Sequence, residues 1–327
     1  MRMQSSFWQH AVPSCRIHTR DALVPDELLK RCRDADALIA FMADRITEPF
    51  LARCARLRII ACALKGNDSF DVAARTRHGV WLTVVPDLLT ALTAELTVGL
   101  IIALGRRMLP GDRLIRAGLF RGWRPTLYGR GLEGSTVGLV GAGAVGKAVA
   151  QRLVGFGPTV LYTDPRPVAF EEKRRLGLHR VQLGELLDRS DYVVLCLPLI
   201  GETRHLVGRT FLSRMKWGAY LVNTARGSLV DEGAVAEALE SQALAGYAAD
   251  VFALGDLALA DRPREINLRL RNAKENTMFT PHLGSAVDEV RRDVALAAAN
   301  SVLECLRGRT PPGAVNRPRV RRGAPSQ

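Results

Sequence analysis

Three glycines and one aspartate form the clearest chemical pattern in this sequence. Gly141, Gly143 and Gly146 come directly after the apolar run 137–140, and a helical apolar pattern follows them. A second apolar run then ends at Asp164. In such a unit the first glycine permits a tight turn, the second lets the backbone approach a pyrophosphate, and the third lets the helix pack on the strand. The free N–H groups at the start of the helix would face the phosphates.

Asp164 extends this pattern toward a ribose. Its carboxylate is placed to accept hydrogen bonds from both ribose hydroxyls, and its charge would repel a 2′-phosphate. The motif therefore predicts a site for NAD in preference to NADP, although Arg166 would weaken that preference. The alternative, a glycine-rich turn without a ligand, is disfavoured because strand, turn, helix and acid occur together.

Cationic side chains and one histidine mark a second chemical pattern. Arg226 follows an apolar run, His282 lies in the segment "TPHLGSA", and Lys65 directly follows the run "IIACAL". A guanidinium fork together with an ammonium group favours a small oxyanion. An imidazole has a pKa that suits proton transfer near neutral pH. A solvated surface lysine is the alternative for Lys65, which its apolar neighbours disfavour.

The elements that must hold these residues alternate between apolar strands and helical patterns. Four strands are expected after the glycine-rich unit, within 191–199, 219–227, 245–252 and 277–282. This alternation predicts an α/β fold with an open, mostly parallel, Rossmann-type sheet. Ligands bind at the carboxyl ends of strands in such sheets. Pro198, Asp250 and His282 fall at those ends.

The 327 residues are enough for two domains. Residues 21–88 show a second, shorter alternation of apolar runs, in "DALIAFM", "LRIIACALKG" and "VWLTVVPD". We expect an NAD-binding domain at 89–284 and a smaller, flavodoxin-like α/β substrate domain formed by both chain ends, 1–88 and 285–327. Residues 1–20 are irregular in pattern, and the basic segment 317–327 is expected to be a flexible tail.

Composition excludes several classes of protein. The net charge is +13, but the basic residues are scattered and not laid in a stripe with aromatics, so no nucleic-acid partner is expected. The apolar runs, such as 100–104, are too short to span a membrane. The six cysteines show no metal-ligand spacing, so we expect no metal site and a reducing, cytoplasmic location.

Five segments together give a family resemblance. "ALKGNDSFD", "GLVGAGAVG", "NTARGSLVDE", "GYAADVF" and "FTPHLGSA" resemble successive signatures of the D-isomer-specific 2-hydroxyacid dehydrogenase family, over roughly residues 30–316. Within that family, "GWRPTLYG" and "ADRPR" are most similar to the phosphonate dehydrogenase branch, which oxidises phosphite to phosphate with NAD⁺. The resemblance implies an oxidoreductase and a homodimer, with the subunit contact around residues 100–130.

The resemblance also implies a role for each matching residue. Arg226 would grip the substrate anion, His282 would be the catalytic acid or base, and Lys65 would meet phosphite. The remaining pocket residues would be Met42, Trp123, Tyr128, Ser285 and Arg291. Asp250 would hold the nicotinamide carboxamide, and the other cofactor positions, beside the glycines and Asp164, would be Thr93, Ala144, Val145, Pro198, Thr224 and Ala225.

One position departs from the family pattern. The carboxylate that usually stands behind the histidine lies three residues after the phenylalanine of "DVF", and here that residue is Gly255. Its neighbour Asp256 is displaced by one residue and is a weaker substitute. Loss of the carboxylate would lower the pKa of the imidazole and loosen its orientation.

Three functions therefore remain open from the sequence. The first is NAD-dependent oxidation of phosphite, favoured because Lys65 adds a second cation. The second is dehydrogenation of a D-2-hydroxy acid on the same fold. The third is a catalytically impaired NAD-binding paralogue that acts as a sensor or partner, which the loss of the carboxylate at Gly255 supports.

Overall fold

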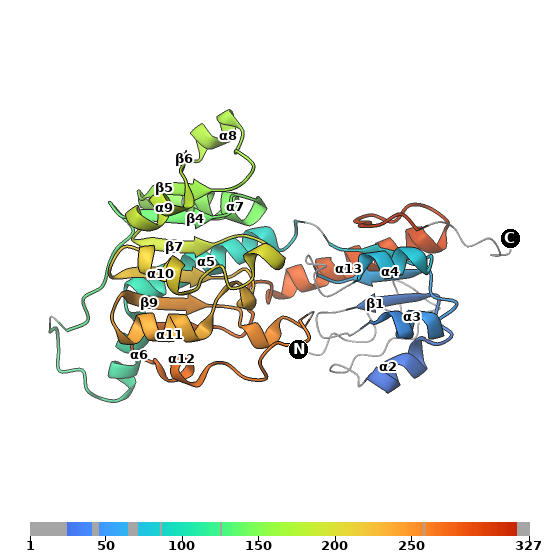
Figure 1. Cartoon of the computed structure of the whole chain (residues 1–327), viewed down its shortest axis with the longest axis horizontal. Helices are drawn as coiled ribbons and strands as arrows, with labels where there is room; N and C mark the ends of the chain where they lie inside the picture. Colours follow the sequence, from blue (N-terminus) through green and yellow to red (C-terminus); the bar gives the residue numbers. More distant parts are fainter. Residues whose placement is uncertain are drawn as a thin grey trace. The chain divides into compact units, whose positions relative to one another are not determined.

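The computed structural model describes residues 25–40, 46–64, 71–85, 87–124, 126–257 and 259–318. Two compact units divide the chain: one takes the residues up to Val85 and from Ala295 onward, and the other takes Pro86–Val294. Each unit contains one parallel β-sheet with helices around it (Figure 1). The predicted α/β class, with a Rossmann-type sheet and a second α/β unit, is confirmed.

The smaller unit holds three parallel strands in the order β1 (Ala37–Ala40), β2 (Ile59–Cys62) and β3 (Trp81–Thr83). Helices α2 (Pro25–Cys32), α3 (Glu48–Arg53) and α4 (Val72–Arg77) accompany them. The C-terminal part of the chain also belongs to the smaller unit, where Asn316 binds backbone groups in and next to β3. Its Oδ1 accepts from the N–H of Leu82 at 2.8 Å, and its Nδ2 donates to the carbonyl of Val80 at 2.9 Å.

The larger unit contains a seven-stranded parallel sheet in which the strand order reverses. From one edge to the other it runs β10 (Thr277–Phe279), β9 (Leu244–Ala249), β8 (Ala219–Asn223), β7 (Tyr192–Leu195), β4 (Thr136–Val140), β5 (Thr159–Thr163) and β6 (Leu178–Arg180). The chain proceeds outward from β4 in one direction and outward from β7 in the other. A ligand crevice is expected at the carboxyl ends of these two strands, where the order switches.

Helices cover both faces of this sheet, which explains why its strands are apolar on both sides. One core contains α5 (Thr90–Gly105) and α7 (Ala144–Leu153). The opposite core contains α9 (Leu183–Arg189), α10 (Arg209–Arg214), α11 (Glu232–Glu240) and α12 (Leu268–Asn272). The edge strand β6 was not predicted from the sequence, because "LHR" has no apolar run and only Leu178 is buried.

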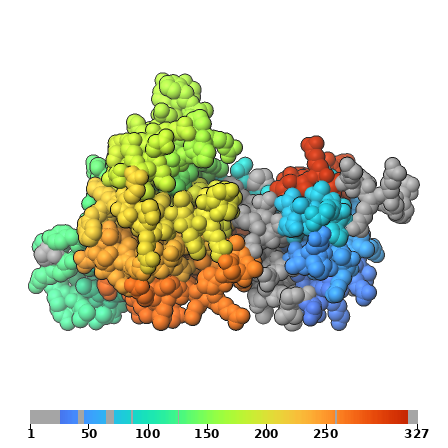
Figure 2. Space-filling view, in the orientation of Figure 1, coloured from blue at the N-terminus to red at the C-terminus, as the bar shows by residue number. Residues whose placement is uncertain are grey.

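Two described helices of the larger unit bury none of their residues, α6 (Met108–Arg116) and α8 (Phe170–Arg175). The yellow-green segment that carries α8 protrudes from the unit in Figure 2. The last helix, α13 (Asp288–Leu306), begins in the larger unit and ends in the smaller one. Within the described ranges, no helix is long and apolar enough to cross a membrane.

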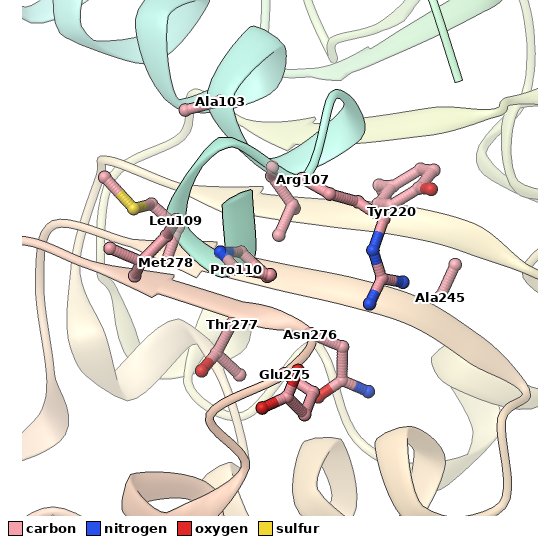
Figure 3. A pocket seen from close by; sticks show the side chains of 11 residues that line it. Ala103, Arg107, Leu109, Pro110, Tyr220, Ala245, Glu275, Asn276, Thr277 and Met278 are labelled. Carbon is pink, nitrogen blue, oxygen red and sulfur yellow. The ribbon is translucent and has the colours of Figure 1, made fainter. Parts of the chain in front are cut away.

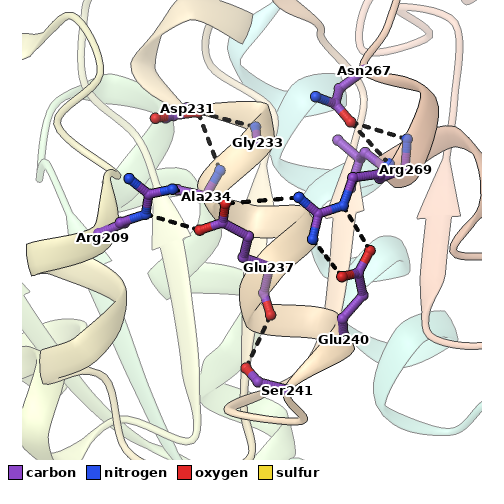
Figure 4. Close-up of polar contacts among 10 residues, drawn as sticks. Arg209, Asp231, Gly233, Ala234, Glu237, Glu240, Ser241, Asn267 and Arg269 are labelled. Carbon is purple, nitrogen blue, oxygen red and sulfur yellow. Dashed lines mark hydrogen bonds and ion pairs between the residues drawn. The ribbon is translucent and has the colours of Figure 1, made fainter.

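Surface ion pairs join α10, α11 and α12 (Figure 4). Arg209 holds Glu237 through two hydrogen bonds of 2.8 and 2.7 Å, and Arg269 pairs with Glu240. Asp231 caps α11 by accepting from the N–H groups of its first turn. These side chains are exposed, so their pairs contribute little to the free energy of folding.

A more buried ion pair lies where β7 begins. The side chain of Asp191 is 7% exposed and accepts from Arg130 at 2.5 Å, from Lys216 at 2.7 Å and from the N–H of Thr136 at 2.9 Å. Desolvation opposes the charged form of Asp191, but these hydrogen bonds and charges outweigh it and hold the pKa of the carboxyl below its usual value. The carboxylate thus ties β4 and β7 together at the amino end of the sheet.

We predict that Asp191→Ala lowers the free energy of unfolding by about 2 kcal/mol at neutral pH, because the N–H of Thr136 and two cations lose a buried acceptor. Since the native pKa is lowered, this stabilisation is present above the unfolded pKa near 3.8 and disappears as the pH falls below it. Urea unfolding at pH 7 and pH 3 measures both effects. The exposed-pair control Arg209→Ala should change stability far less, and an equal loss in both variants would contradict the assignment.

Candidate active site

The glycine-rich turn after β4 has the shape that a pyrophosphate requires. Gly141 has a φ of 103°, and a Cβ there would lie 2.4 Å from the carbonyl oxygen of Cys196. A Cβ at Gly146 would lie 2.3 Å from the carbonyl oxygen of Gly141, so the helix approaches the turn closely. A Cβ at Gly143, by contrast, meets nothing within 4 Å. The start of α7 therefore faces open space, with the first N–H groups of the helix, at Ala144 and Val145, available to phosphate oxygens.

Asp164 lies against this turn, directly after β5. Its Oδ2 accepts from the N–H of Ala142 and its Oδ1 from the N–H of Arg166, both at 2.9 Å. Each carboxylate oxygen can accept a further hydrogen bond, which suits two ribose hydroxyls. The guanidinium group of Arg180 donates to the carbonyl of Asp164 at 2.9 Å, so a positive charge lies near this position. The residues present fit an NAD molecule.

The turn that carries Arg226 is held by a fully buried amide. Asn223 ends β8, donates through Nδ2 to the carbonyl of Arg226 at 2.8 Å, and accepts at Oδ1 from the N–H of Ala225 at 3.0 Å. Thr224 is joined to Thr97 of α5 by a hydroxyl–hydroxyl contact of 2.7 Å. The half-buried guanidinium group of Arg226 donates to the carbonyl of Ala225 at 2.8 Å.

The segment that carries His282 is held by a buried carboxylate. Asp250 follows β9 and is 2% exposed. Its Oδ1 accepts from Thr280 Oγ1 and from the N–H of Leu283, both at 2.6 Å, and its Oδ2 accepts from the N–H of Gly284 at 2.9 Å. The backbone carbonyl of Asp250 accepts from the N–H of His282 at 2.9 Å. His282 itself has a left-handed φ of 59°, which is uncommon for a side chain of this kind.

The electrostatic surroundings favour the neutral imidazole. The pKa of His282 is lowered from 6.5: desolvation lowers it, Asp250 raises it, the guanidinium groups of Arg226 and Arg291 lower it, and Asp256 raises it. The residue nevertheless keeps an accessible surface, so desolvation here means partial shielding and not enclosure. The charges of Arg226 and Asp250 thus both act on the protonation of His282.

The position of the missing carboxylate is open. Gly255 belongs to the 3-10 turn Ala253–Gly255, and a Cβ there would meet nothing within 4 Å. Asp256 does not take over, because its Oδ2 accepts from the N–H of Ser228 at 2.6 Å and so supports the Arg226 turn. Within the part of the chain that the structure describes, no hydrogen-bond partner of the His282 ring is present.

Four other predicted residues also lie in the larger unit. Thr93 of α5 donates to the carbonyl of Gly284 at 3.4 Å, and the buried Ser285 follows that glycine. Pro198 lies beyond the carboxyl end of β7, where its carbonyl accepts from Thr203 Oγ1 at 2.8 Å. Arg291 lies in α13 and is exposed.

The other four predicted pocket residues are either outside the described part of the chain or on an exposed segment. Lys65 and Met42 lie outside the described residues. Trp123 and Tyr128 are 81% and 77% exposed on the segment that leads from α6 to β4, which loops away from the sheet (Figure 1).

A pocket at the other end of the sheet is a different feature (Figure 3). Its wall includes Tyr220, Ala245 and Thr277, which stand at the beginnings of β8, β9 and β10, together with Arg107 and Glu275. The predicted site residues follow the carboxyl ends of the same strands. The described residues that line this pocket include no histidine, and we do not assign the chemistry to it.

Three supporting residues, Asn223, Asp256 and Glu232, were not predicted from the sequence in the roles that the structure gives them. The carboxylate of Glu232 accepts from the N–H groups of Ala253 at 3.1 Å and Asn267 at 2.8 Å. A polar residue directly after a buried strand was the available signal for Asn223. Nothing in the sequence indicates which backbone groups Glu232 and Asp256 meet.

Comparison with known proteins gives a consistent family. Residues 98–284 match the model of the D-isomer specific 2-hydroxyacid dehydrogenase, NAD binding domain. Glyoxylate reductases from Aeropyrum pernix and Thermococcus litoralis are 39% and 35% identical over 297 residues, which is 89% of this chain and 86% of each relative. These relatives are named for glyoxylate and not for phosphite.

Solved structures agree with the sequence comparison. The TT0316 protein from Thermus thermophilus superposes with a TM-score of 0.82 at 38% identity, covering 91% of both chains. D-lactate dehydrogenase from Aquifex aeolicus, solved with NAD and lactic acid, gives a TM-score of 0.82 at 27% identity, covering 93% of this chain and 92% of that one. The chain has the NAD-binding domain of these proteins and is an NAD-dependent oxidoreductase by descent. It belongs to the D-isomer-specific 2-hydroxyacid dehydrogenase family.

Proposed function

We propose that the protein interconverts a small 2-oxo acid and the corresponding 2-hydroxy acid, of the D form where that acid is chiral, with glyoxylate as the leading substrate. The observation that carries this proposal is the placement of Arg226 and His282 after β8 and β10, two strands separated only by β9. Asp250 after β9 connects the two segments through hydrogen bonds to Asn223 and His282. The names of the relatives favour glyoxylate over other 2-oxo acids.

The chain's own residues supply binding and proton transfer. NAD, when bound, gives or takes the hydride. Arg226 holds the substrate carboxylate through its guanidinium fork, which matches two oxygens at once. In the direction of reduction, a protonated His282 donates a proton to the carbonyl oxygen of the substrate. In the direction of oxidation, a neutral His282 removes the hydroxyl proton.

Phosphite oxidation is the second candidate, supported by the segments "GWRPTLYG" and "ADRPR" and by Lys65. In that reaction His282 would deprotonate the water that attacks phosphorus, and Arg226 would hold the phosphite oxygens. The 2-hydroxy acid reading is preferred because the relatives at 35–39% identity are glyoxylate reductases. The open position at Gly255 supports the third candidate, an NAD-binding protein with impaired turnover.

We also propose that the protein forms a homodimer through the region around α6. Large apolar side chains gather there in exposed positions, with Leu119 64%, Phe120 54% and Trp123 81% exposed. Exposed apolar patches of this kind mark interaction surfaces.

Asp164 further supports a preference for NAD over NADP, since its carboxylate would repel a 2′-phosphate.

The substrate assignment predicts NADH consumption with glyoxylate. Absorbance at the nicotinamide band should fall when NADH is mixed with glyoxylate or another small 2-oxo acid, and should rise far more slowly when NAD⁺ is mixed with phosphite. Faster turnover of phosphite would establish the second candidate. NADH binding without turnover of any of these substrates would establish the third.

Removal of the guanidinium group should mainly weaken handling of the substrate anion. We predict that Arg226→Gln lowers kcat/KM for the 2-oxo acid by roughly 100-fold, because a desolvated charge pair is lost. Arg226→Lys keeps the charge but not the fork, and it should recover only part of the loss. NADH affinity, measured by fluorescence titration, should stay near the wild-type value; a matching loss of NADH affinity would show that Arg226 serves the cofactor.

The lowered pKa of His282 sets the direction of the pH profile. Oxidation needs the neutral ring, so its rate should rise through a pKa below 6.5 and level off above it, whereas reduction should fall over the same range. Gly255→Glu restores a negative charge in open space and should move both midpoints up by about one pH unit. Gly255→Gln has the same length without the charge and should not move them. Equal shifts in the two variants would contradict an electrostatic role for this position.

A further inference from the structure

Asp250 occupies an unusual place between the two segments that carry the chemistry. It stands after β9, the middle strand of β8, β9 and β10, and its side chain is 2% exposed. Its two carboxylate oxygens accept from three donors, all in the segment 280–284: Thr280 Oγ1, the N–H of Leu283 and the N–H of Gly284. Its backbone joins the same segment, because its carbonyl accepts from the N–H of His282 at 2.9 Å.

Three successive backbone N–H groups, those of residues 282–284, therefore converge on one aspartate. Successive N–H groups around a left-handed residue form a concave anion-binding nest, and the left-handed residue here is His282, with φ of 59°. The carboxylate of Asp250 accepts from two of these N–H groups, those of Leu283 and Gly284, and its backbone carbonyl accepts from the third. A side chain in this backbone conformation persists only when its surroundings fix it.

Gly284 makes this close approach possible. A Cβ at that position would lie 3.2 Å from Asp250 Oδ2 and 3.4 Å from Thr93 Oγ1, which is tighter than ordinary contact. The absence of a side chain at Gly284 thus allows its N–H to reach the carboxylate at 2.9 Å. The carboxylate of Asp250 thus binds the segment both before His282, at Thr280, and after it, at Leu283 and Gly284.

We infer that Asp250 is a positioning residue that fixes the backbone of residues 282–284 and thereby aims the His282 imidazole at the substrate. The N–H of Asp250 donates to the carbonyl of Asn223 at 2.9 Å, and Asn223 holds the carbonyl of Arg226. The same buried pair therefore sets the segment bearing the acid or base and the turn bearing the anion-binding guanidinium group. That the imidazole of His282 is directed at a substrate rests on the proposed function. That Asp250 fixes the backbone of residues 282–284 does not depend on it.

The test compares two variants that each remove one negative charge near His282. Asp250→Asn also disturbs the acceptors of the N–H groups of 282–284, because one carboxylate oxygen becomes an amide that donates. Asp256→Asn leaves that segment untouched, since Asp256 accepts from Ser228. Hydrogen exchange followed by mass spectrometry on a peptide covering 280–286 should accelerate at least about tenfold in Asp250→Asn and stay at the wild-type rate in Asp256→Asn. Wild-type exchange in Asp250→Asn would overturn the inference.

Kinetics separates positioning from contact with the nicotinamide. With glyoxylate, Asp250→Asn should lower kcat by roughly 100-fold, as expected for a misdirected catalytic group, and this loss should be much larger than any change in the dissociation constant of NADH. A weakened NADH affinity with unchanged kcat and unchanged exchange would show instead that Asp250 acts only as the carboxamide ligand. If the wild-type protein turns over no 2-oxo acid, the proposed function fails, and the exchange measurement still decides whether Asp250 holds the segment.

A milder variant covers the case in which Asp250→Asn does not fold. Thr280→Val removes one of the three donors to the carboxylate and keeps the shape of the side chain. Circular dichroism should show a folded protein, and the 280–286 peptide should exchange faster than in the wild type, by less than in a folded Asp250→Asn. Unchanged exchange in a folded Thr280→Val variant would argue against the proposed hold.

Discussion

Buried parallel strands must satisfy their backbone polar groups where they end, and this constraint shapes the whole candidate site. At the carboxyl ends of β8 and β9 the solution is a buried polar side chain, Asn223 in one case and Asp250 in the other. Asn223 binds the backbone of the segment that follows β8, and Asp250 binds the backbone of the segment that follows β10. Because Arg226 and His282 lie in those segments, the same hydrogen bonds that satisfy the backbone at the ends of the strands also position these two side chains.

The electrostatics of the site follow from what surrounds the imidazole. Desolvation lowers the pKa of His282, and two guanidinium groups, Arg226 and Arg291, lower it further, while Asp250 and Asp256 raise it. A carboxylate at position 255 would have opposed the lowering. Its replacement by Gly255 favours the neutral ring, which acts as a base, over the protonated ring, which acts as an acid. In the proposed reaction, oxidation would therefore keep its full rate down to a lower pH than in a protein that has the carboxylate.

The sequence predicted the parts of this molecule that depend on local patterns. Apolar runs indicated six strands of the larger sheet, and the glycine spacing with Asp164 indicated the cofactor turn, because strand burial and positive φ leave direct marks on residue type. Strand β6 escaped since a short, polar edge strand leaves no such mark. The role of Asp250 toward 282–284, and that of Asp256 toward Ser228, depend on backbone groups many residues away, which residue types alone do not reveal. The predicted pocket positions of Trp123 and Tyr128 came from resemblance, and the structure places both on an exposed segment.

Isotope transfer shows whether Arg226 and His282 arrange a 2-oxo acid for reaction with NADH. The protein is incubated with glyoxylate and NADH that carries deuterium at both positions of nicotinamide C4, and the product is examined by proton NMR. We expect glycolate with one deuterium at C2, and a rate that falls steeply in His282→Asn while NADH binding persists. Absence of deuterium from the product, or a His282→Asn variant as fast as the wild type, would contradict this arrangement.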